Sequence, residues 1–271
     1  MANFISSIQN PRVKRLVALQ QKSALRKAEE VFVVEGRREL EHCLEAGFRL
    51  EEVYVCPEVM GADDAALKMV SGYVDEGNLL HVSAAVYNRI AYRGTTEGIV
   101  ATVHSRNLTL QDLQLPASPL LIVLESVEKP GNLGAVLRSA DAAKADAVIV
   151  CDPLTNLFNP NLIRSSIGAI FTVPTVACTS EECLAFLRNQ GISILTAQLQ
   201  DSHLYYDTPM TGPTAIVMGT ESTGLTPQWR KAATSHIRIP MLGRLDSLNV
   251  SVSAAILLFE AVRQRQVGQG V

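Results

Sequence analysis

The strongest constraint on the fold of this chain is a series of short apolar runs between Leu120 and Pro240, each followed by a loop or a segment with helical spacing. The first run, LLIVLE at residues 120–125, is apolar at nearly every position, as expected of a strand in a parallel sheet covered on both faces. Such alternation predicts a doubly wound α/β domain of roughly 150 residues, which we assign to residues 119–271. Its later strands are expected at residues 147–151, 172–177, 192–197, 215–219 and 236–240.

A second, smaller domain is expected before this sheet. Predicted strands alternate with helical segments there, which indicates a small α/β sandwich over residues 1–106. The stretch NLTLQDLQLPAS, residues 107–118, carries Asn, Asp, Pro and Ser and few charges, so we expect it to be the linker. The strands of the small domain are expected at residues 31–35, 50–56, 79–82 and 98–103.

Basic residues outnumber acidic ones between Ile5 and Arg38, where Pro11 opens a predicted helix at a position that tolerates proline. This segment is either a solvated amphipathic helix or a surface that contacts RNA phosphates. A basic and aromatic group around Tyr92 is equally open between an RNA clamp and a plain loop. The candidate RNA-binding residues are Arg12, Lys14, Arg15, Arg37, Arg89 and Arg93.

The overall composition is that of an ordinary globular protein, and a net charge of −3 gives no general nucleic-acid signal, so any basic surface must be local. The five cysteines form no CxxC pair, and the spacing of Cys178 and Cys183 is too irregular to indicate zinc, so we expect buried thiols and no metal. No apolar signal core or membrane-length run occurs, which predicts a cytoplasmic protein.

Three junctions share one design, a buried strand followed by a glycine-containing loop and a helix. They read LIVLE-SVEKPGNLG-AVLR, AIVMG-TESTGL-TPQW and IRIP-MLGRLDSLNV-SVSA. Ligands of open α/β sheets bind where such loops meet beyond the strands' carboxyl ends. None of the three is a GxGxxG or Walker loop, so a conventional dinucleotide or ATP site is disfavoured.

The third junction carries the clearest sign of a ligand surface. Ser247 and Asn249 are natural caps for a long helix that we expect to begin near Ser251. Leu248 and Val250 are apolar within what should be a polar loop. Apolar side chains beside cap residues suggest that this loop holds a ligand.

The stretches PGNLGAVLRSADA, IVMGTESTGL and IRIPMLGRLDSLNVSVSAAI resemble, in the same order, the three signature motifs of the SpoU/TrmH branch of SPOUT RNA methyltransferases. The resemblance covers about residues 120–265. The stretch FVVEGRRELEHCLEAG is similar to the small substrate-binding domain that this branch often carries, which in turn is similar to ribosomal proteins that bind RNA kinks.

The resemblance implies transfer of a methyl group from S-adenosylmethionine to a ribose 2′-OH of rRNA or tRNA, and by analogy the two-domain layout favours 23S rRNA. It also implies a deep trefoil knot near the C-terminus of the parallel sheet, a homodimer formed through the C-terminal domain, and a cofactor held in the knot loops. The implied cofactor-binding residues are Gly219, Ile239, Met241, Gly243 and Leu248. The implied catalytic and RNA-facing residues are Asn132, Arg138, Glu221, Ser247 and Asn249.

The family assigns the activation of the ribose hydroxyl to Arg138. Arginine keeps its proton in proteins, so we expect Arg138 to hold the target phosphate and stabilise alkoxide charge instead. A phosphate or Glu221 would then receive the proton. Other hypotheses are a tRNA methyltransferase, a non-catalytic ribosome-assembly factor on the same fold, and a small-molecule α/β enzyme. Intact Arg138, Glu221 and Asn249 argue against the assembly factor.

Overall fold

The computed structural model describes residues 3–61, 65–92, 97–220 and 223–267. The chain forms two compact units. The N-terminal unit consists of Met1–Arg106 and Asn156–Thr172, and the C-terminal unit of Asn107–Thr155 and Val173–Val271. Within these described ranges, no helix is long and apolar enough to cross a membrane.

The N-terminal unit is built on a five-stranded mixed sheet of order β1-β4-β3-β5-β2. Strands β1 and β4 are parallel, as are β3 and β4, whereas β5 is antiparallel to both β2 and β3. The four predicted strands are present, and β1 is a short addition that the sequence pattern did not reveal. The strands are β1 (Asn3–Ile5), β2 (Val31–Glu35), β3 (Leu50–Val55), β4 (Leu79–Val82) and β5 (Ile99–His104).

Helices cover this sheet and begin where the sequence indicates. The side chain of Asn10 caps the first helix by accepting a hydrogen bond from the N–H of Arg12 at 2.9 Å, and Pro11 is its first residue, as predicted. The buried face of that helix carries Val13, Leu16 and further apolar side chains of one core. The helices are α1 (Pro11–Gln21), α2 (Ser23–Glu29), α3 (Arg37–Glu45), α4 (Pro57–Met60), α5 (Ala65–Val70) and α6 (Ala84–Ile90), with the 3-10 turn η1 (Glu76–Asn78).

Two short helices from the middle of the chain, α8 (Pro160–Ser165) and α9 (Ala169–Thr172), also belong to the N-terminal unit. The rings of Phe158 and Phe171 stack on Phe32 of β2 with centroid separations of 4.3 and 6.0 Å. The stretch LIRSSIGAIF, residues 162–171, predicts a single helix from its sequence, and this prediction is wrong. Ile167 and Gly168 both have positive φ, of 56° and 83°, so the helix breaks between them.

The C-terminal unit is built on a seven-stranded sheet of order β10-β12-β9-β11-β6-β7-β8, in which every neighbouring pair is parallel. The predicted α/β fold with a parallel sheet is confirmed. Because β11 lies between β6 and β9, the strand order reverses there, and ligands of such sheets bind at this kind of reversal. The strands are β6 (Leu120–Glu125), β7 (Ala147–Cys151), β8 (Thr175–Cys178), β9 (Ser193–Ala197), β10 (His203–Leu204), β11 (Thr214–Met218) and β12 (Ser235–Arg238).

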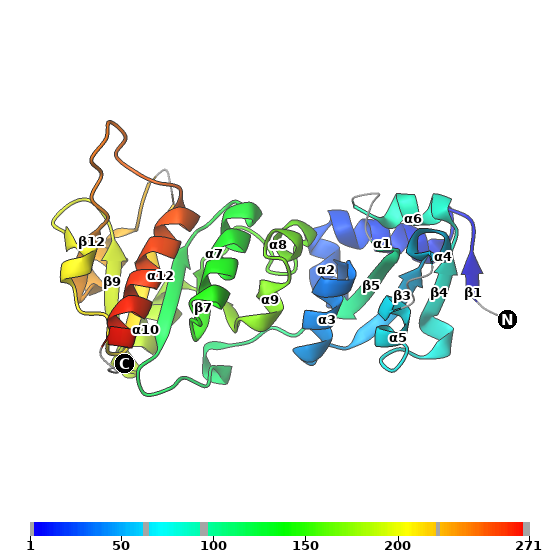
Figure 1. The fold of residues 1–271 in the computed structure, drawn as a ribbon, viewed down its shortest axis with the longest axis horizontal. Helices are drawn as coiled ribbons and strands as arrows, with labels where there is room; N and C mark the ends of the chain where they lie inside the picture. Colours follow the sequence, from blue (N-terminus) through cyan, green and yellow to red (C-terminus); the bar gives the residue numbers. More distant parts are fainter. Residues whose placement is uncertain (1–2, 62–64, 93–96, 221–222, 268–271) are drawn as a thin grey trace. The chain divides into compact units, whose positions relative to one another are not determined.

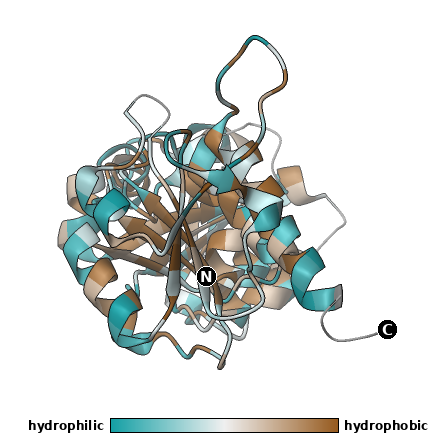
Figure 2. Ribbon diagram, turned by 90° about the vertical axis from the view of Figure 1, so that its left-hand side faces the viewer, coloured by the Kyte–Doolittle hydropathy of each residue, from teal (hydrophilic) through white to brown (hydrophobic). Residues whose placement is uncertain are grey.

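Helices pack on both faces of this sheet. Alternate residues of the strands, such as Leu121, Val123 and Ile149, form one core with α10 (Ser180–Asn189) and α11 (Pro227–Ala232). The intervening residues therefore face α7 (Pro130–Ala142) and α12 (Val250–Val267), which lie side by side (Figure 1). Figure 2 shows the apolar strands in brown inside and polar helix surfaces in teal outside. The 3-10 turns η2 (Leu110–Asp112) and η3 (Tyr205–Asp207) complete the unit.

Candidate active site

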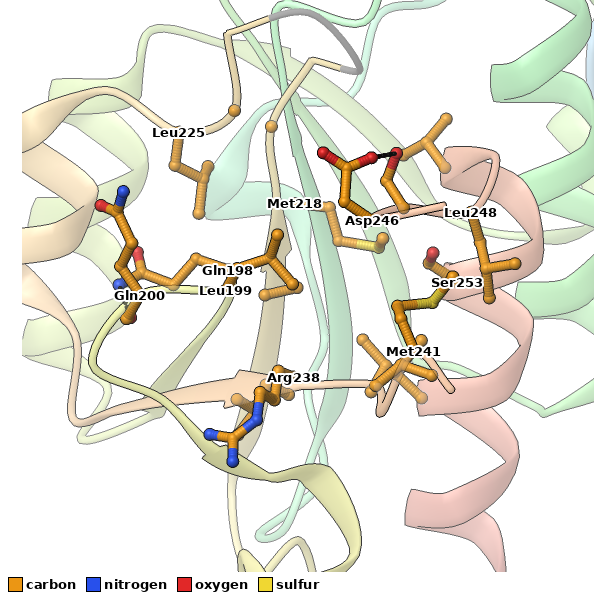
Figure 3. A pocket seen from close by; sticks show the side chains of 18 of the residues that line it. Gln198, Leu199, Gln200, Met218, Leu225, Arg238, Met241, Asp246, Leu248 and Ser253 are labelled. Carbon is orange, nitrogen blue, oxygen red and sulfur yellow. Dashed lines mark hydrogen bonds between the residues drawn. The ribbon is translucent and has the colours of Figure 1, made fainter. Parts of the chain in front are cut away.

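A cavity of about 330 Å³ lies at the carboxyl ends of β9, β11 and β12. Figure 3 shows that its lining is mostly apolar, from Leu199, Met218, Leu225, Met241 and Leu248. Polar groups line it too: Gln198 and Gln200 after β9, Arg238 of β12, and Asp246 and Ser253. This composition is typical of a small-molecule site, in which a few polar groups orient a largely apolar ligand.

Four of the five predicted cofactor residues line this cavity: Gly219, Ile239, Met241 and Leu248. They come from two different junctions, after β11 and after β12. The fifth, Gly243, does not line it and lies in the exposed part of the loop between β12 and α12, drawn in orange in Figure 1. Gly243 is therefore not supported as a cofactor contact.

The loop after β11 folds back sharply on itself. A Cβ atom on Gly219 would overlap the carbonyl group of Gly224 and the nitrogen of Leu225. Thr220 and Gly224 form an antiparallel bridge, and Gly224 has a φ of 68°. Both glycines are thus required by the backbone itself, and the first brings main-chain atoms to the cavity wall.

The amide of Asn249 donates a hydrogen bond from Nδ2 to Oδ1 of Asn132 at 3.2 Å, which joins the first and third junctions. Asn249 also caps α12, because its Oδ1 accepts hydrogen bonds from the N–H and the hydroxyl of Ser251 at 3.0 and 2.6 Å. Of the two predicted caps, Ser247 does not serve as one. Its hydroxyl lies 3.4 Å from the carboxylate of Asp246, and the residue lines the cavity.

Asn132 lies in the first turn of α7, which starts at Pro130. We predicted that PGNLG belongs to a loop and that the helix begins at Ala135, and this is wrong. The fixed φ of proline suits the first helical position, so the helix forms through the glycines. A similar shift occurs at α10. The stretch SEECLAFLRNQG predicts a helix capped by Ser180, but the structure caps it with a box formed by Thr179 and Glu182.

Arg138 lies further along α7 with an exposed side chain. The i, i+3 spacing of Arg138 and Asp141 would suit a salt bridge on the helix surface, which would be a purely structural role. With the described residues, however, the guanidinium makes no ion pair or hydrogen bond. An exposed guanidinium without a carboxylate partner can bind an external anion. Glu221, the proposed proton acceptor, lies outside the described residues.

Two of the predicted RNA-binding arginines are engaged in ion pairs of the N-terminal unit. Arg15 forms a two-pronged pair with Glu51, both N–O distances being 2.9 Å, and also pairs with Glu29 at 2.7 Å. Arg12 lies 3.3 Å from Glu52. The hydrogen bond with Glu51 raises the pKa of Arg15 even though burial lowers it. These arginines therefore stabilise the domain.

The other predicted RNA contacts are differently placed. Lys14 and Arg89 are exposed and line a hollow of about 240 Å³ between α1 and α6, together with Lys22, another base of the predicted basic segment. The backbone N–H of Arg37 donates to Glu97, and Arg93 lies outside the described residues.

The sequence reasoning also missed several side chains. The guanidinium of Arg164, on α8, lies 3.7 Å from the ring centroid of Tyr92. Tyr92 therefore forms a cation–π contact with an arginine from a distant part of the sequence. At the cavity, Gln198, Leu199 and Gln200 were not expected. These residues directly follow β9. Because β9 lies between β11 and β12 in the sheet, knowledge of the strand order would have identified them as cavity residues.

Comparison with known families agrees with these motifs. Residues 119–259 match the SpoU rRNA Methylase family, and residues 10–101 match the MRM3-like substrate binding domain. The first match contains every predicted cofactor and catalytic residue, and the second contains all the predicted RNA contacts.

Individual proteins are similar along most of the chain. The 23S rRNA (guanosine-2′-O-)-methyltransferase RlmB of Photobacterium profundum is 35% identical over 226 residues, covering 81% of this chain and 91% of that protein. The Escherichia coli protein of the same name is 36% identical, covering 80% and 91%.

Two solved structures extend the similarity to the whole fold. An RNA 2′-O ribose methyltransferase superposes with a TM-score of 0.83 at 38% identity, covering 97% of this chain and 99% of that one. The AdoMet-bound rRNA methyltransferase of Sinorhizobium meliloti superposes with a TM-score of 0.86 at 27% identity, covering 96% and 97%. The match over its C-terminal unit and these relatives show that the chain belongs to the SpoU rRNA methylase family.

Proposed function

We propose that this protein transfers a methyl group from S-adenosylmethionine to a ribose 2′-OH of RNA, with 23S rRNA as the substrate. The observation that carries the proposal is that the second and third junctions meet at one cavity, while the Asn132–Asn249 hydrogen bond joins the first junction to the third. The names of the RlmB relatives support the choice of 23S rRNA and of a guanosine ribose.

The cavity fits S-adenosylmethionine in chemical character. When bound, the cofactor supplies a reactive methyl group on a positively charged sulfur. Gly219 would hold it through main-chain groups, because no side chain can occupy that position. Met241 and Leu248 would cover its apolar parts, and the cavity presents both Asp246 and two arginines, Arg230 and Arg238, to the charged groups of the cofactor.

The chain's own residues would position the ribose. Arg138 would bind the phosphate next to the target ribose and stabilise negative charge on the 2′ oxygen without giving up its own proton. The Asn132–Asn249 pair would fix the first turn of α7 against the start of α12. We assign acceptance of the hydroxyl proton to Glu221 or to the RNA phosphate. Positioning of this kind can supply much of the rate when the methyl donor is already reactive.

Further features follow from family membership as proposals. We infer a trefoil knot in the C-terminal unit and an N-terminal unit that binds RNA in the manner of kink-binding ribosomal proteins. We also infer a homodimer through the C-terminal unit, because Val252 and Phe259 of α12 are each 47% exposed and offer an apolar surface. An rRNA substrate implies a cytoplasmic location.

The test is methyl transfer from radiolabelled S-adenosylmethionine to unmodified 23S rRNA, followed by mapping of the modified nucleotide. Arg138→Ala should lower turnover by about a hundredfold or more, as loss of a charge-stabilising group does, while the affinity for the cofactor stays within a few-fold. Arg188→Ala, which removes an exposed arginine from α10, is the matched control.

Three results would contradict the proposal. Methylation of tRNA alone would identify a tRNA enzyme. Tight rRNA binding without any transfer would indicate an assembly factor. Turnover by Arg138→Ala within a few-fold of the wild-type rate would exclude the proposed role of Arg138.

A further inference from the structure

Three cysteine thiols meet at the edge of the C-terminal sheet that carries the strands' carboxyl ends. Cys151 and Cys178 are the last residues of β7 and β8 and are register partners on these neighbouring parallel strands. Cys183 lies one turn into α10, the helix that follows β8. The three Sγ atoms all lie within 4.8 Å of one another, although the residues span 32 positions of sequence.

The topology explains why the thiols converge. In-register residues on neighbouring strands point to the same face of the sheet, so Cys151 and Cys178 emerge side by side. The capping box of Thr179 and Glu182 then starts α10 directly after β8 and brings Cys183 back over the strand ends. These elements are fixed by the sheet ladder and by a buried core, so the cluster is preformed.

Access and local charge favour a cation at this cluster. Cys151 and Cys183 are fully buried, whereas Cys178 is partly exposed and opens the cluster to solvent. The charged groups that act on Cys178 are the carboxylates of Glu182 and Asp152. Asp152 is held in place by hydrogen bonds from the hydroxyl and the N–H of Ser180, at 2.6 and 3.3 Å. A negative potential of this kind repels anions and attracts metal cations.

The donor set selects the chemical class of the cation. Thiolate sulfur prefers soft or borderline metals, and zinc binds thiolates in a tetrahedral arrangement whose fourth position can be filled by water. A metal–sulfur bond of about 2.3 Å places the sulfurs of a tetrahedral site about 3.8 Å apart. The observed cluster, with separations of at most 4.8 Å, could reach this geometry through small side-chain movements.

We propose that Cys151, Cys178 and Cys183 form a three-thiolate site for a zinc-class divalent cation, with the fourth position open to solvent at Cys178. Binding forms three metal–sulfur bonds, and each thiol that is protonated beforehand releases its proton to water. The site is separate from the proposed cofactor cavity, because none of the three cysteines lines that cavity.

The experiment is a titration of the full-length, chelator-treated protein with Cd²⁺, whose bonds to thiolate give an ultraviolet charge-transfer absorption. A phosphine reductant keeps the thiols free without competing as a thiol. We expect one Cd²⁺ per chain, and at least a tenfold loss of affinity in Cys178→Ala. Cys43→Ala, which removes a buried thiol of the N-terminal unit, should bind as the wild type does. Absence of the sulfur-to-metal absorption in the wild type, or an unchanged Cd²⁺ affinity in Cys178→Ala, would overturn the proposal.

A second measurement uses only the wild-type protein, in case the variants fail to fold. Alkylation of Cys178 is followed by mass spectrometry with and without saturating Zn²⁺. We expect Zn²⁺ to slow the alkylation of Cys178 at least tenfold. Equal rates would show that the three thiols are ordinary packing residues and would overturn the proposal. Neither readout requires RNA or S-adenosylmethionine, so its outcome is independent of methyl transfer.

Discussion

The buried carboxylate of Glu125 accepts two hydrogen bonds from Thr226, one from its N–H at 2.8 Å and one from its hydroxyl at 2.6 Å, although 101 positions separate the residues. Glu125 ends β6, and Thr226 precedes α11 and closes the loop that contains Gly219 and Gly224. A charge buried in the sheet therefore fixes one end of a loop that lines the proposed cofactor cavity. Charge-assisted bonds of this type are among the stronger ones in proteins.

Glu125→Gln should weaken this attachment. The amide keeps the size of the side chain but presents an NH₂ group that cannot accept from Thr226. We expect a loss of stability of about 1–3 kcal/mol, as for other buried polar groups left without partners. The affinity for S-adenosylmethionine should fall as the loop loosens. Urea unfolding and titration calorimetry measure the two effects.

Glu182→Gln is the control for Glu125→Gln, because the carboxylate of this capping residue accepts its hydrogen bonds from Thr179 at the start of α10. It should leave cofactor affinity unchanged. If Glu125→Gln binds the cofactor as tightly as the wild type does, the carboxylate does not position the loop.

Asn249 has two separable roles, as the cap of α12 and as the donor to Asn132. Asn249→Ser keeps a capping oxygen but removes the amide donor, whereas Asn249→Ala removes both. We expect Asn249→Ala to lose about 1 kcal/mol of stability and Asn249→Ser only a few tenths. Both should lower methyl transfer if the hydrogen bond to Asn132 matters, as thermal unfolding and the methylation assay would reveal. Full activity of Asn249→Ser would show that capping is the only role.

The ion pair of Arg15 with Glu51 should make stability depend on pH. Burial by itself would raise the pKa of Glu51, but the hydrogen bonds and charge of Arg15 outweigh it, so the pKa is lowered in the folded state. A lowered carboxyl pKa stabilises the fold above the unfolded-state value of about 4.3, and this contribution is lost as the pH falls through the folded-state pKa.

Arg15→Met should therefore cost about 1 kcal/mol at pH 7, as expected for a partly exposed pair, and progressively less below about pH 4. Urea unfolding over this pH range tests the prediction, with Arg188→Met as the control for loss of an exposed arginine. A stability difference between the wild type and Arg15→Met that stays constant with pH would mean that Glu51 does not sense Arg15.

The sequence predicted local structure well and long-range proximity poorly. The apolar runs located β6 and β7 to the residue, because a strand covered on both faces leaves an unbroken signal. The motif resemblance located Asn132 and Asn249, but their hydrogen bond depends on the packing of α7 on α12. The register of Cys151 with Cys178 was equally hidden, since no spacing rule relates β7 to β8. Local signals such as helix caps could not show that residues 156–172 belong to the N-terminal unit.

Residues 156–172 belong to the N-terminal unit, so deleting residues 1–106 would remove the side chains on which this segment packs. Phe158 and Phe171 are only 7% and 8% exposed, because they pack on Phe32 and Phe48 of the N-terminal unit. A fragment of residues 107–271 would retain both phenylalanines without these partners. We therefore expect it to bind a hydrophobic dye and to aggregate, as size-exclusion chromatography would detect.

Replacing both phenylalanines by serine within the fragment is the matched rescue. The substituted fragment should regain solubility, since it removes the two large apolar side chains that lose their cover. In the full-length protein the same double substitution should be destabilising by several kcal/mol, because each site would lose a buried aromatic ring. A soluble unsubstituted fragment with no dye binding would show that 156–172 finds other cover, and that the aromatic cluster is not what ties this segment to the N-terminal unit.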